Sequence, residues 1–169
     1  MTTTSRTVPV VTRPARASDA ATIARTVLLG VQTYVAFAPA EWKPVPPPDE
    51  IEMTTAQLAR RDTWALLAEI AGEPAAHVSL FPYWQPGGAV YLWQLFVRPP
   101  WWGTGLAAGL HDAFVAESRD RGYREARLHT PAAHGRARRF YERRGWRATG
   151  QVVTWRGLPV VEYRCLLRS

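Results

Sequence analysis

The sequence predicts an α+β fold in which helices pack against a central sheet. Strand-like apolar runs alternate along the chain with segments in which apolar residues recur at spacings of three and four. The chain has 169 residues, of which 47% are hydrophobic and 21% charged, enough apolar material for one globular domain with its own core. We therefore expect a single domain over residues 1–169, with residues 1–6 as a disordered tail.

The first predicted elements are a short strand and a long helix. The strand covers residues 8–11 and ends at Arg13-Pro14. Ser18 is the expected N-cap of a helix that runs to about Phe37. One face of this helix is apolar because hydrophobic residues recur at spacings of four, four and three, at Ile23, Val27, Val31 and Tyr34. This face must pack against another part of the fold.

A proline-rich segment separates this helix from the next one. Residues 39–48 contain five prolines, a density that excludes both a helix interior and a central strand, so we expect a stiff loop. Asp49 and Glu52 have the spacing of an N-cap and its capping-box partner. They predict a second helix that continues through Leu58.

Three strands are predicted next, and the third forms the centre of the sheet. Residues 63–71 and 75–83 flank the turn Gly72-Glu73-Pro74, which indicates a hairpin. Residues 89–97 read AVYLWQLFV, a nearly continuous run of apolar and aromatic residues. Such a run is typical of a central strand that is buried on both faces.

The last part of the chain predicts two helices and three strands. Gly122 and Gly145 are the expected ends of the two helices. The turn between the last two strands falls at Arg156-Gly157. In chain order, these elements cover residues 104–121, 124–130, 134–144, 146–155 and 159–167.

Charge and cysteine content limit the partners and the compartment. Lys and Arg number 21 against 14 Asp and Glu, so the net charge of +7 predicts an anionic partner such as nucleic acid, a membrane surface or a phosphorylated small molecule. Cys165 is the single cysteine, which excludes an intramolecular disulfide and a CxxC metal site and indicates a reducing compartment. No signal peptide or membrane span of about 20 apolar residues is present. We expect a cytoplasmic protein with no metal and no membrane partner.

A glycine-rich turn leads from the central strand into the next helix. Gly103 and Gly105 lie where the first turn of that helix leaves N–H groups unpaired, a pattern that predicts a cradle for phosphate. The alternative is a loop that needs glycine only for its positive φ. Gly103, Gly105 and Ala108 also fit a dinucleotide fingerprint, but five residues separate Val97 from Gly103, and a Rossmann turn follows its strand directly. A Walker A loop would need a lysine that this segment lacks.

Two segments together resemble the GNAT superfamily of N-acyltransferases. The segment LFVRPPWWGTGLAAGL is similar to the acyl-coenzyme A signature, in which a strand ending in V-x-P leads to Q/R-x-x-G-x-G/A. Six residues occupy that hexapeptide: Trp102, Gly103, Thr104, Gly105, Leu106 and Ala107. HGRARRFYERRGW, from His134, resembles the family's N-x-x-A-x-x-F-Y-x-x-x-G-F segment. Trp102 replaces the usual Gln or Arg, and His134 replaces the usual Asn.

The resemblance covers nearly the whole chain and implies a fold and an activity. The implied fold is α+β (α/β three-layer), with a GNAT-like mixed, mostly antiparallel central sheet flanked by about four helices. The implied activity is N-acetyltransferase activity, with acetyl-CoA as cosubstrate. The primary amine of a small molecule or peptide would attack the thioester directly in a ternary complex. The strand backbone would pair with the pantetheine arm, and the hexapeptide would hold the pyrophosphate. The remaining cofactor-binding residues are then Leu95, Phe96, Val97, His134, Ala137, Arg139 and Phe140.

Catalytic roles are assigned to three residues. Tyr141 is the expected general acid, because a phenol with a pKa of about 10 is still protonated when a thiolate of pKa about 8.5 departs. The core strand carries no carboxylate, so His77 and His129 are the candidates for the general base. The alternatives are a relay through ordered water and an amine that enters already neutral.

The acceptor and the alternatives to the enzyme stay open at this point. Either the acidic residues Glu41, Asp49, Glu50 and Glu52 attract a cationic amine, or they solvate the loop and cap the helix. A non-catalytic acyl-CoA-binding sensor would explain the missing carboxylate. A nucleic-acid-binding module would explain the charge, but the sequence has no zinc-finger, RNP or KH pattern. Exposed strand edges and abundant aromatic residues point to a homodimer.

Overall fold

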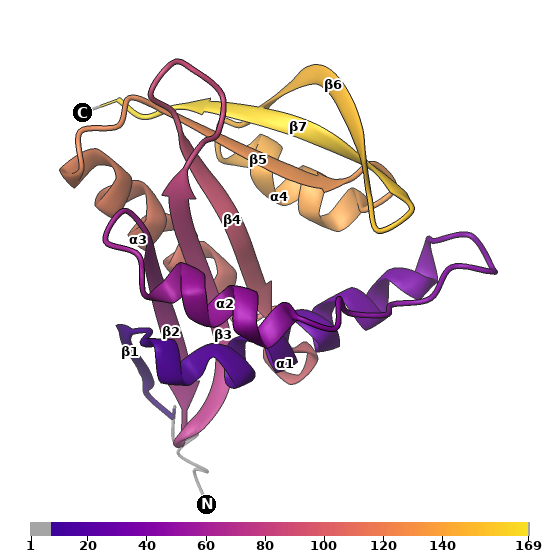
Figure 1. Ribbon diagram of the computed structural model, residues 1–169, viewed down its shortest axis with the longest axis horizontal. Helices are drawn as coiled ribbons and strands as arrows, with labels where there is room; N and C mark the ends of the chain where they lie inside the picture. Colours follow the sequence, from indigo (N-terminus) through magenta and orange to yellow (C-terminus); the bar gives the residue numbers. More distant parts are fainter. Residues whose placement is uncertain (1–7, 169) are drawn as a thin grey trace, which may run out of the picture.

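The computed structural model describes residues 8–168, and its elements follow the predicted order (Figure 1). The predicted tail at 1–6 lies outside the described residues. The strands are β1 (Val10–Pro14), β2 (Trp64–Ile70), β3 (Glu73–Pro82), β4 (Val90–Val97), β5 (Glu125–Pro131), β6 (Arg147–Trp155) and β7 (Leu158–Leu166). The helices are α1 (Ala20–Gln32), α2 (Glu50–Leu58), α3 (Leu106–Asp120) and α4 (Gly135–Arg143). In the described part of the chain, no helix is both long enough and apolar enough to span a membrane.

The strands form one sheet in the order β1-β2-β3-β4-β5-β7-β6. Within the described residues β4 and β5 are the only parallel neighbours, and every other pair is antiparallel. β4 and β5 pair only at Val90 with Ala126 and at Tyr91 with Arg127, whereas β3 follows β4 as far as Val97. The sheet therefore opens into a V beyond Tyr91. The prediction of a mixed, mostly antiparallel sheet with about four helices is confirmed.

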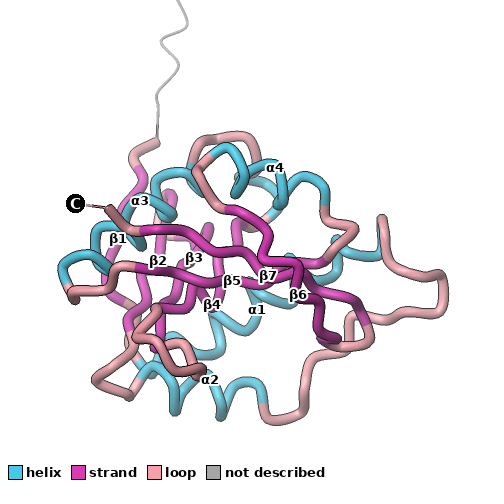
Figure 2. The backbone as a smooth tube through the Cα atoms, turned by 90° about the horizontal axis from the view of Figure 1, so that it is seen from above, coloured by secondary structure: helices cyan, strands magenta, loops and turns pink. Residues whose placement is uncertain are grey.

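The helices cover the sheet in two layers. Figure 2 shows α1 and α2 on one side of the sheet and α3 and α4 on the other. The apolar face of α1 packs against Leu67 of β2 through Ile23, Val27 and Val31, as the spacing of these residues predicts. On the opposite face, Phe114 of α3 belongs to the larger core that includes Leu92. The sheet is buried between these two layers.

Three local details differ from the prediction. The N-cap of α1 is Asp19, which is the last residue of a short 3-10 turn and is held by Arg13 at 2.8 Å, so the assignment to Ser18 is wrong. Asp49 does precede α2, but its side chain makes no capping hydrogen bond, so the predicted capping box is not formed. The end of β4 is only half-buried, from Leu95 onward, because it borders the V.

Helix α1 approaches β4 closely at Gly30. A Cβ atom at this position would overlap the ring of Phe96 and lie 2.7 Å from its Cε1 atom. Glycine in the middle of a helix ordinarily costs stability. Here it permits the contact between α1 and the strand that lines the V.

Replacing this glycine should therefore destabilise the fold. We expect Gly30→Ala to lower the free energy of unfolding by about 1–3 kcal/mol, because Phe96 must move out of its packed position. The control is Gly109→Ala in α3, where a Cβ meets nothing within 4 Å. That change should raise the stability by about 0.5–1 kcal/mol. Urea unfolding measures both, and a Gly30→Ala protein as stable as the wild type would contradict the close approach.

His77 lies fully buried at the centre of β3. Its Nε2 atom is 2.9 Å from Oε1 of Gln94 on β4, while Nδ1 has no hydrogen-bond partner among the described residues. Burial lowers the pKa of this imidazole to about 4. His77 is therefore neutral in the folded protein at neutral pH.

This buried imidazole should make stability depend on pH. In the unfolded chain the histidine pKa is about 6.5, so below that pH the unfolded state binds more protons and the free energy of unfolding falls. For His77 the loss is about 2 kcal/mol between pH 7.5 and pH 5. Urea unfolding at both pH values should show a correspondingly smaller loss for His77→Gln than for the wild type. An NMR titration that placed the His77 pKa near 6.5 would contradict the expectation directly.

Candidate active site

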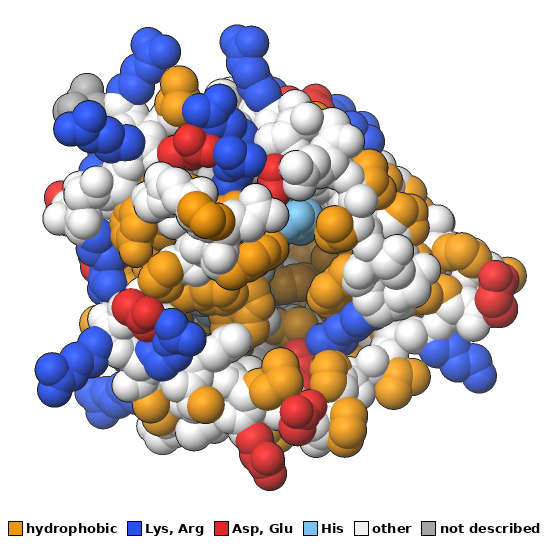
Figure 3. All heavy atoms as spheres, turned by 45° about the horizontal axis from the view of Figure 1, so that its top comes forward, with side chains coloured by type: hydrophobic (Ala, Val, Ile, Leu, Met, Phe, Trp, Pro, Cys, Tyr) orange, Lys and Arg blue, Asp and Glu red, His pale blue; other side chains and the backbone are white. Residues whose placement is uncertain are grey.

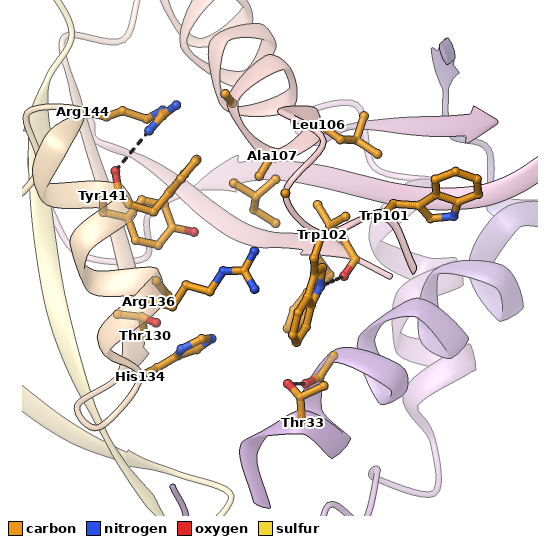
Figure 4. A pocket seen from close by; sticks show the side chains of 18 of the residues that line it. Thr33, Trp101, Trp102, Leu106, Ala107, Thr130, His134, Arg136, Tyr141 and Arg144 are labelled. Carbon is orange, nitrogen blue, oxygen red and sulfur yellow. Dashed lines mark hydrogen bonds between the residues drawn. The ribbon is translucent and has the colours of Figure 1, made fainter. Parts of the chain in front are cut away.

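The opening between β4 and β5 leads into a cleft of about 420 Å³. Its walls come from the ends of both strands, the start of α3, one face of α4 and the end of α1 (Figure 4). Figure 3 shows the molecular surface hollowed on one face, with hydrophobic side chains on the floor and a histidine beside them. Most of the predicted site residues line the cleft: Leu95, Phe96, Val97, Trp102, Gly103, Gly105, Leu106, Ala107, His129, His134, Ala137, Phe140 and Tyr141.

The turn before α3 presents backbone N–H groups to the cleft. Gly103 and Gly105 have φ values of 75° and 81°, in the left-handed region that favours glycine. A Cβ atom at either position would meet nothing within 4 Å, so conformation and not crowding requires these glycines. Gly105 is the N-cap of α3, a helix long enough to carry a macrodipole, and the N–H groups of its first turn are free for an anion.

Trp102 bridges the cleft at its edge. Its indole N–H donates a hydrogen bond of 2.7 Å to the carbonyl oxygen of Val97 at the end of β4. From the opposite wall, the guanidinium of Arg136 on α4 lies 4.7 Å from the centre of the indole ring (Figure 4). Trp102 occupies the position where the acyl-coenzyme A signature usually has Gln or Arg. Its indole is hydrogen-bonded to the backbone of β4.

Tyr141 projects from α4 into the inner part of the cleft. Its ring packs edge-on against Phe140 and Trp146, and only 8% of the residue is exposed. Burial raises the pKa of the phenol above its usual value. The hydroxyl therefore stays protonated at neutral pH, in the state that a general acid requires.

His129 lies on β5, just beyond the last pairing of β5 with β4. Its Nδ1 atom is 2.8 Å from the hydroxyl of Tyr91, and its Nε2 atom is 3.8 Å from a carboxylate oxygen of Glu162 on β7. Burial lowers the pKa of the imidazole, although the charge of Glu162 acts in the opposite direction. The ring is thus neutral at neutral pH, between a phenol and a carboxylate.

Glu162, on β7, is a buried carboxylate beside His129 that the sequence analysis does not identify, and it does not line the cleft. It is 1% exposed and accepts hydrogen bonds from Tyr83, Thr149 and Arg127. Burial alone would raise its pKa, but these hydrogen bonds and the charge of Arg127 lower it, so the group stays ionised. The predicted core strand carries no carboxylate, and Glu162 comes instead from β7, opposite His129 of β5. The one sequence signal was a single acid in the mainly apolar run LPVVEYRCL, where Arg164 is the only other charged residue.

Three predicted site residues lie away from the cleft. His77 is buried within the sheet and contributes nothing to the cleft lining. The hydroxyl of Thr104 bonds to the carbonyl oxygen of Trp101 at 2.6 Å, and Thr104 does not line the cleft. Arg139 is also absent from the lining. The arginines of this region that do line it are Arg136, Arg143 and Arg144.

Comparison with known proteins places these features in a family. Residues 31–146 match the family model described as the acetyltransferase (GNAT) family. No curated protein sequence matches this chain. Solved structures share the fold at low sequence identity.

One similar structure is a GNAT-family acetyltransferase from Desulfovibrio desulfuricans, with 23% identity and a TM-score of 0.72 over 95% of this chain and 100% of that one. Another is an acetyltransferase from Salmonella typhimurium, solved with acetyl-CoA, with 19% identity and a TM-score of 0.72 over 95% of each chain. A third is an N-acetyltransferase from Thermoplasma acidophilum in complex with coenzyme A, with 14% identity and a TM-score of 0.67 over 91% of this chain and 98% of that one.

The family model covers well over half of the chain, and the similar structures share the fold over 91–95% of it. The chain therefore belongs to the acetyltransferase (GNAT) family and is an acyltransferase.

Proposed function

We propose that this protein transfers the acetyl group of acetyl-CoA to the primary amine of a small molecule or peptide, with both substrates bound together. The observation that carries the proposal is the V between β4 and β5, which opens beside the free N–H groups at the start of α3. A strand edge and a helix N-terminus are what an extended arm and a diphosphate need. The acetyl-CoA and coenzyme A in two similar structures agree with this assignment.

The cofactor-binding residues follow from the two walls of the cleft. The backbone at Leu95–Val97 would pair with the pantetheine arm, and the turn from Trp102 to Ala107 would hold the pyrophosphate. Arg136 and Arg143 of α4, and Arg144 at its C-cap, line the cleft and are better placed than Arg139 to neutralise phosphate charge. The ring of His134 packs against Tyr34 at the cleft wall, with a ring-centre distance of 5.3 Å. It would contact the pantetheine.

Tyr141 and His129 would manage the protons of the reaction. The amine nitrogen forms a bond to the thioester carbon and the carbon–sulfur bond breaks, while a backbone N–H near Val97 stabilises the charge on the carbonyl oxygen. Tyr141 gives a proton to the departing sulfur. His129 accepts the proton of the amine, directly or through an ordered water molecule. We prefer His129 to His77 because only His129 lines the cleft.

The same geometry favours an enzyme over a sensor. An acyl-CoA-binding sensor would need the cradle but no acid or base. Here both Tyr141 and His129 line the cleft, each in the protonation state that catalysis requires. The nucleic-acid-binding alternative rests on charge alone.

The cradle can be tested at Ala107, which lies in the first turn of α3 and lines the cleft. We expect Ala107→Glu to weaken acetyl-CoA binding about 10-fold more than Ala107→Gln, because the two side chains have similar size but only the carboxylate repels the diphosphate. An acid at this end of a helix favours the helix, so the fold should be retained. Titration calorimetry measures the affinities, and equal values for the two variants would contradict the proposed diphosphate site.

The general acid can be tested at Tyr141. Tyr141→Phe should lower kcat by about 100-fold, the contribution of one proton donor, and should change the acetyl-CoA affinity by less than about two-fold. Thiol release from acetyl-CoA with a panel of primary amines gives the rates. The control is Tyr123→Phe, because Tyr123 lies between α3 and β5 and does not line the cleft. A Tyr141→Phe enzyme with full turnover would remove Tyr141 from the mechanism.

A further inference from the structure

A second cavity of about 240 Å³ lies on the face of the sheet that carries α1 and α2. Its walls come from α1, α2, β4, the proline-rich loop and the turn between β6 and β7. Phe96 at the end of β4 lines both this cavity and the cleft. The two spaces therefore meet at one side chain.

A bulge in β4 shapes the wall of the second cavity. The pairing of β3 with β4 shifts between Ser79, opposite Gln94, and Leu80, opposite Leu92, which leaves Trp93 without a partner on β3. Both Trp93 and Gln94 line the cavity. The Oε1 atom of Gln94 is hydrogen-bonded to His77, and among the described residues the NH2 group of the same amide has no acceptor.

The charged groups of the cavity are Glu50 and Arg156. Glu50 begins α2 and is the one member of the predicted acidic group Glu41, Asp49, Glu50 and Glu52 that lines the cavity. Its Oε1 atom accepts a hydrogen bond of 3.1 Å from Nη2 of Arg156. The cavity thus holds a cation and an anion side by side.

Arg156 is held in place and still has a free donor. It occupies the turn between β6 and β7 with a φ of 48°, its carbonyl oxygen accepts the indole N–H of Trp42 at 2.7 Å, and its guanidinium packs on Trp155. Its Nη1 atom is buried and has no hydrogen-bond partner among the described residues. A buried donor without a partner is unfavourable, and an anionic ligand would pair with it.

We propose that this cavity binds the acceptor and that the acceptor is a small amine that also carries a carboxylate, such as an apolar or aromatic α-amino acid. This inference rests on the acetyltransferase function proposed above. The carboxylate binds Nη1 of Arg156 and the amide of Gln94, while Glu50 attracts the ammonium group before it is deprotonated. The side chain of the acceptor packs against the apolar walls at Met53, Trp93 and Trp155.

Other acceptor classes fit this arrangement less well. An amine without an anionic group would leave Nη1 of Arg156 unpaired. A phosphorylated amine would bring two negative charges next to Glu50, with only one free guanidinium nitrogen to compensate. A zwitterion matches both members of the Arg156–Glu50 pair.

The test compares three acceptors that differ only at the carboxylate: L-phenylalanine, L-phenylalaninamide and 2-phenylethylamine. We expect kcat/KM for L-phenylalanine to exceed that for each of the other two by about 10- to 100-fold, the range that one charge-assisted hydrogen bond supplies. Thiol release from acetyl-CoA gives the rates. Titration calorimetry with acetyl-CoA alone tests separately whether the protein binds the acyl donor.

Arg156→Asn should abolish this preference. Asparagine tolerates the left-handed backbone of the turn, and the loss should appear as a rise of about 10- to 100-fold in KM for L-phenylalanine, with little change for 2-phenylethylamine. Arg61→Asn, in an exposed turn, removes the same charge elsewhere and should have no effect. The acetyl-CoA affinity should be unchanged in both variants.

The outcomes separate this inference from the function on which it rests. If acetyl-CoA binds and the wild type uses the amide or 2-phenylethylamine as well as L-phenylalanine, or uses none of the three, the carboxylate inference is wrong. If acetyl-CoA does not bind, the proposed function itself fails. The comparison of the three acceptors with the wild type needs no variant, so a misfolded Arg156→Asn protein would not obscure the result.

Discussion

The early end of the pairing between β4 and β5 is the constraint on which the site depends. Two register pairs, at Val90 and Tyr91, hold the parallel strands together, and beyond them the strands diverge. The divergence exposes one edge of β4 to the cleft, while β3 keeps the other edge paired to Val97. Each wall of the cleft is then supplied by the element that follows a diverging strand, α3 after β4 and α4 after β5.

The same divergence explains why the two cavities are neighbours. Side chains at the end of β4 alternate between the cleft and the opposite face, and the bulge at Trp93 changes which residues face which side. Gly30 lets α1 come close enough to fix Phe96 between the two spaces. One strand therefore borders both proposed substrates.

Much of the fold could be predicted because local patterns determine it. The spacing of Ile23, Val27 and Val31 identified the buried face of α1, and the glycine-rich turn at Gly103 and Gly105 placed the start of α3 at about Thr104, two residues before its observed start at Leu106. The hexapeptide and the segment from His134 located both walls of the cleft. Contacts between residues that lie far apart in the sequence could not be predicted. The approach of Glu162 to His129 depends on the pairing of β7 with β5, and the choice of Arg136 over Arg139 depends on the rotation of α4.

The hydrogen bond from Trp102 to Val97 has a consequence for solubility. An unpaired strand edge is a template for strands of other molecules and a route to aggregation. Here the indole occupies the last carbonyl group of that edge, at Val97, and the guanidinium of Arg136 packs on the indole ring. With its last carbonyl group already bonded to Trp102, this end of β4 offers one acceptor fewer to a strand of another molecule than a bare edge would.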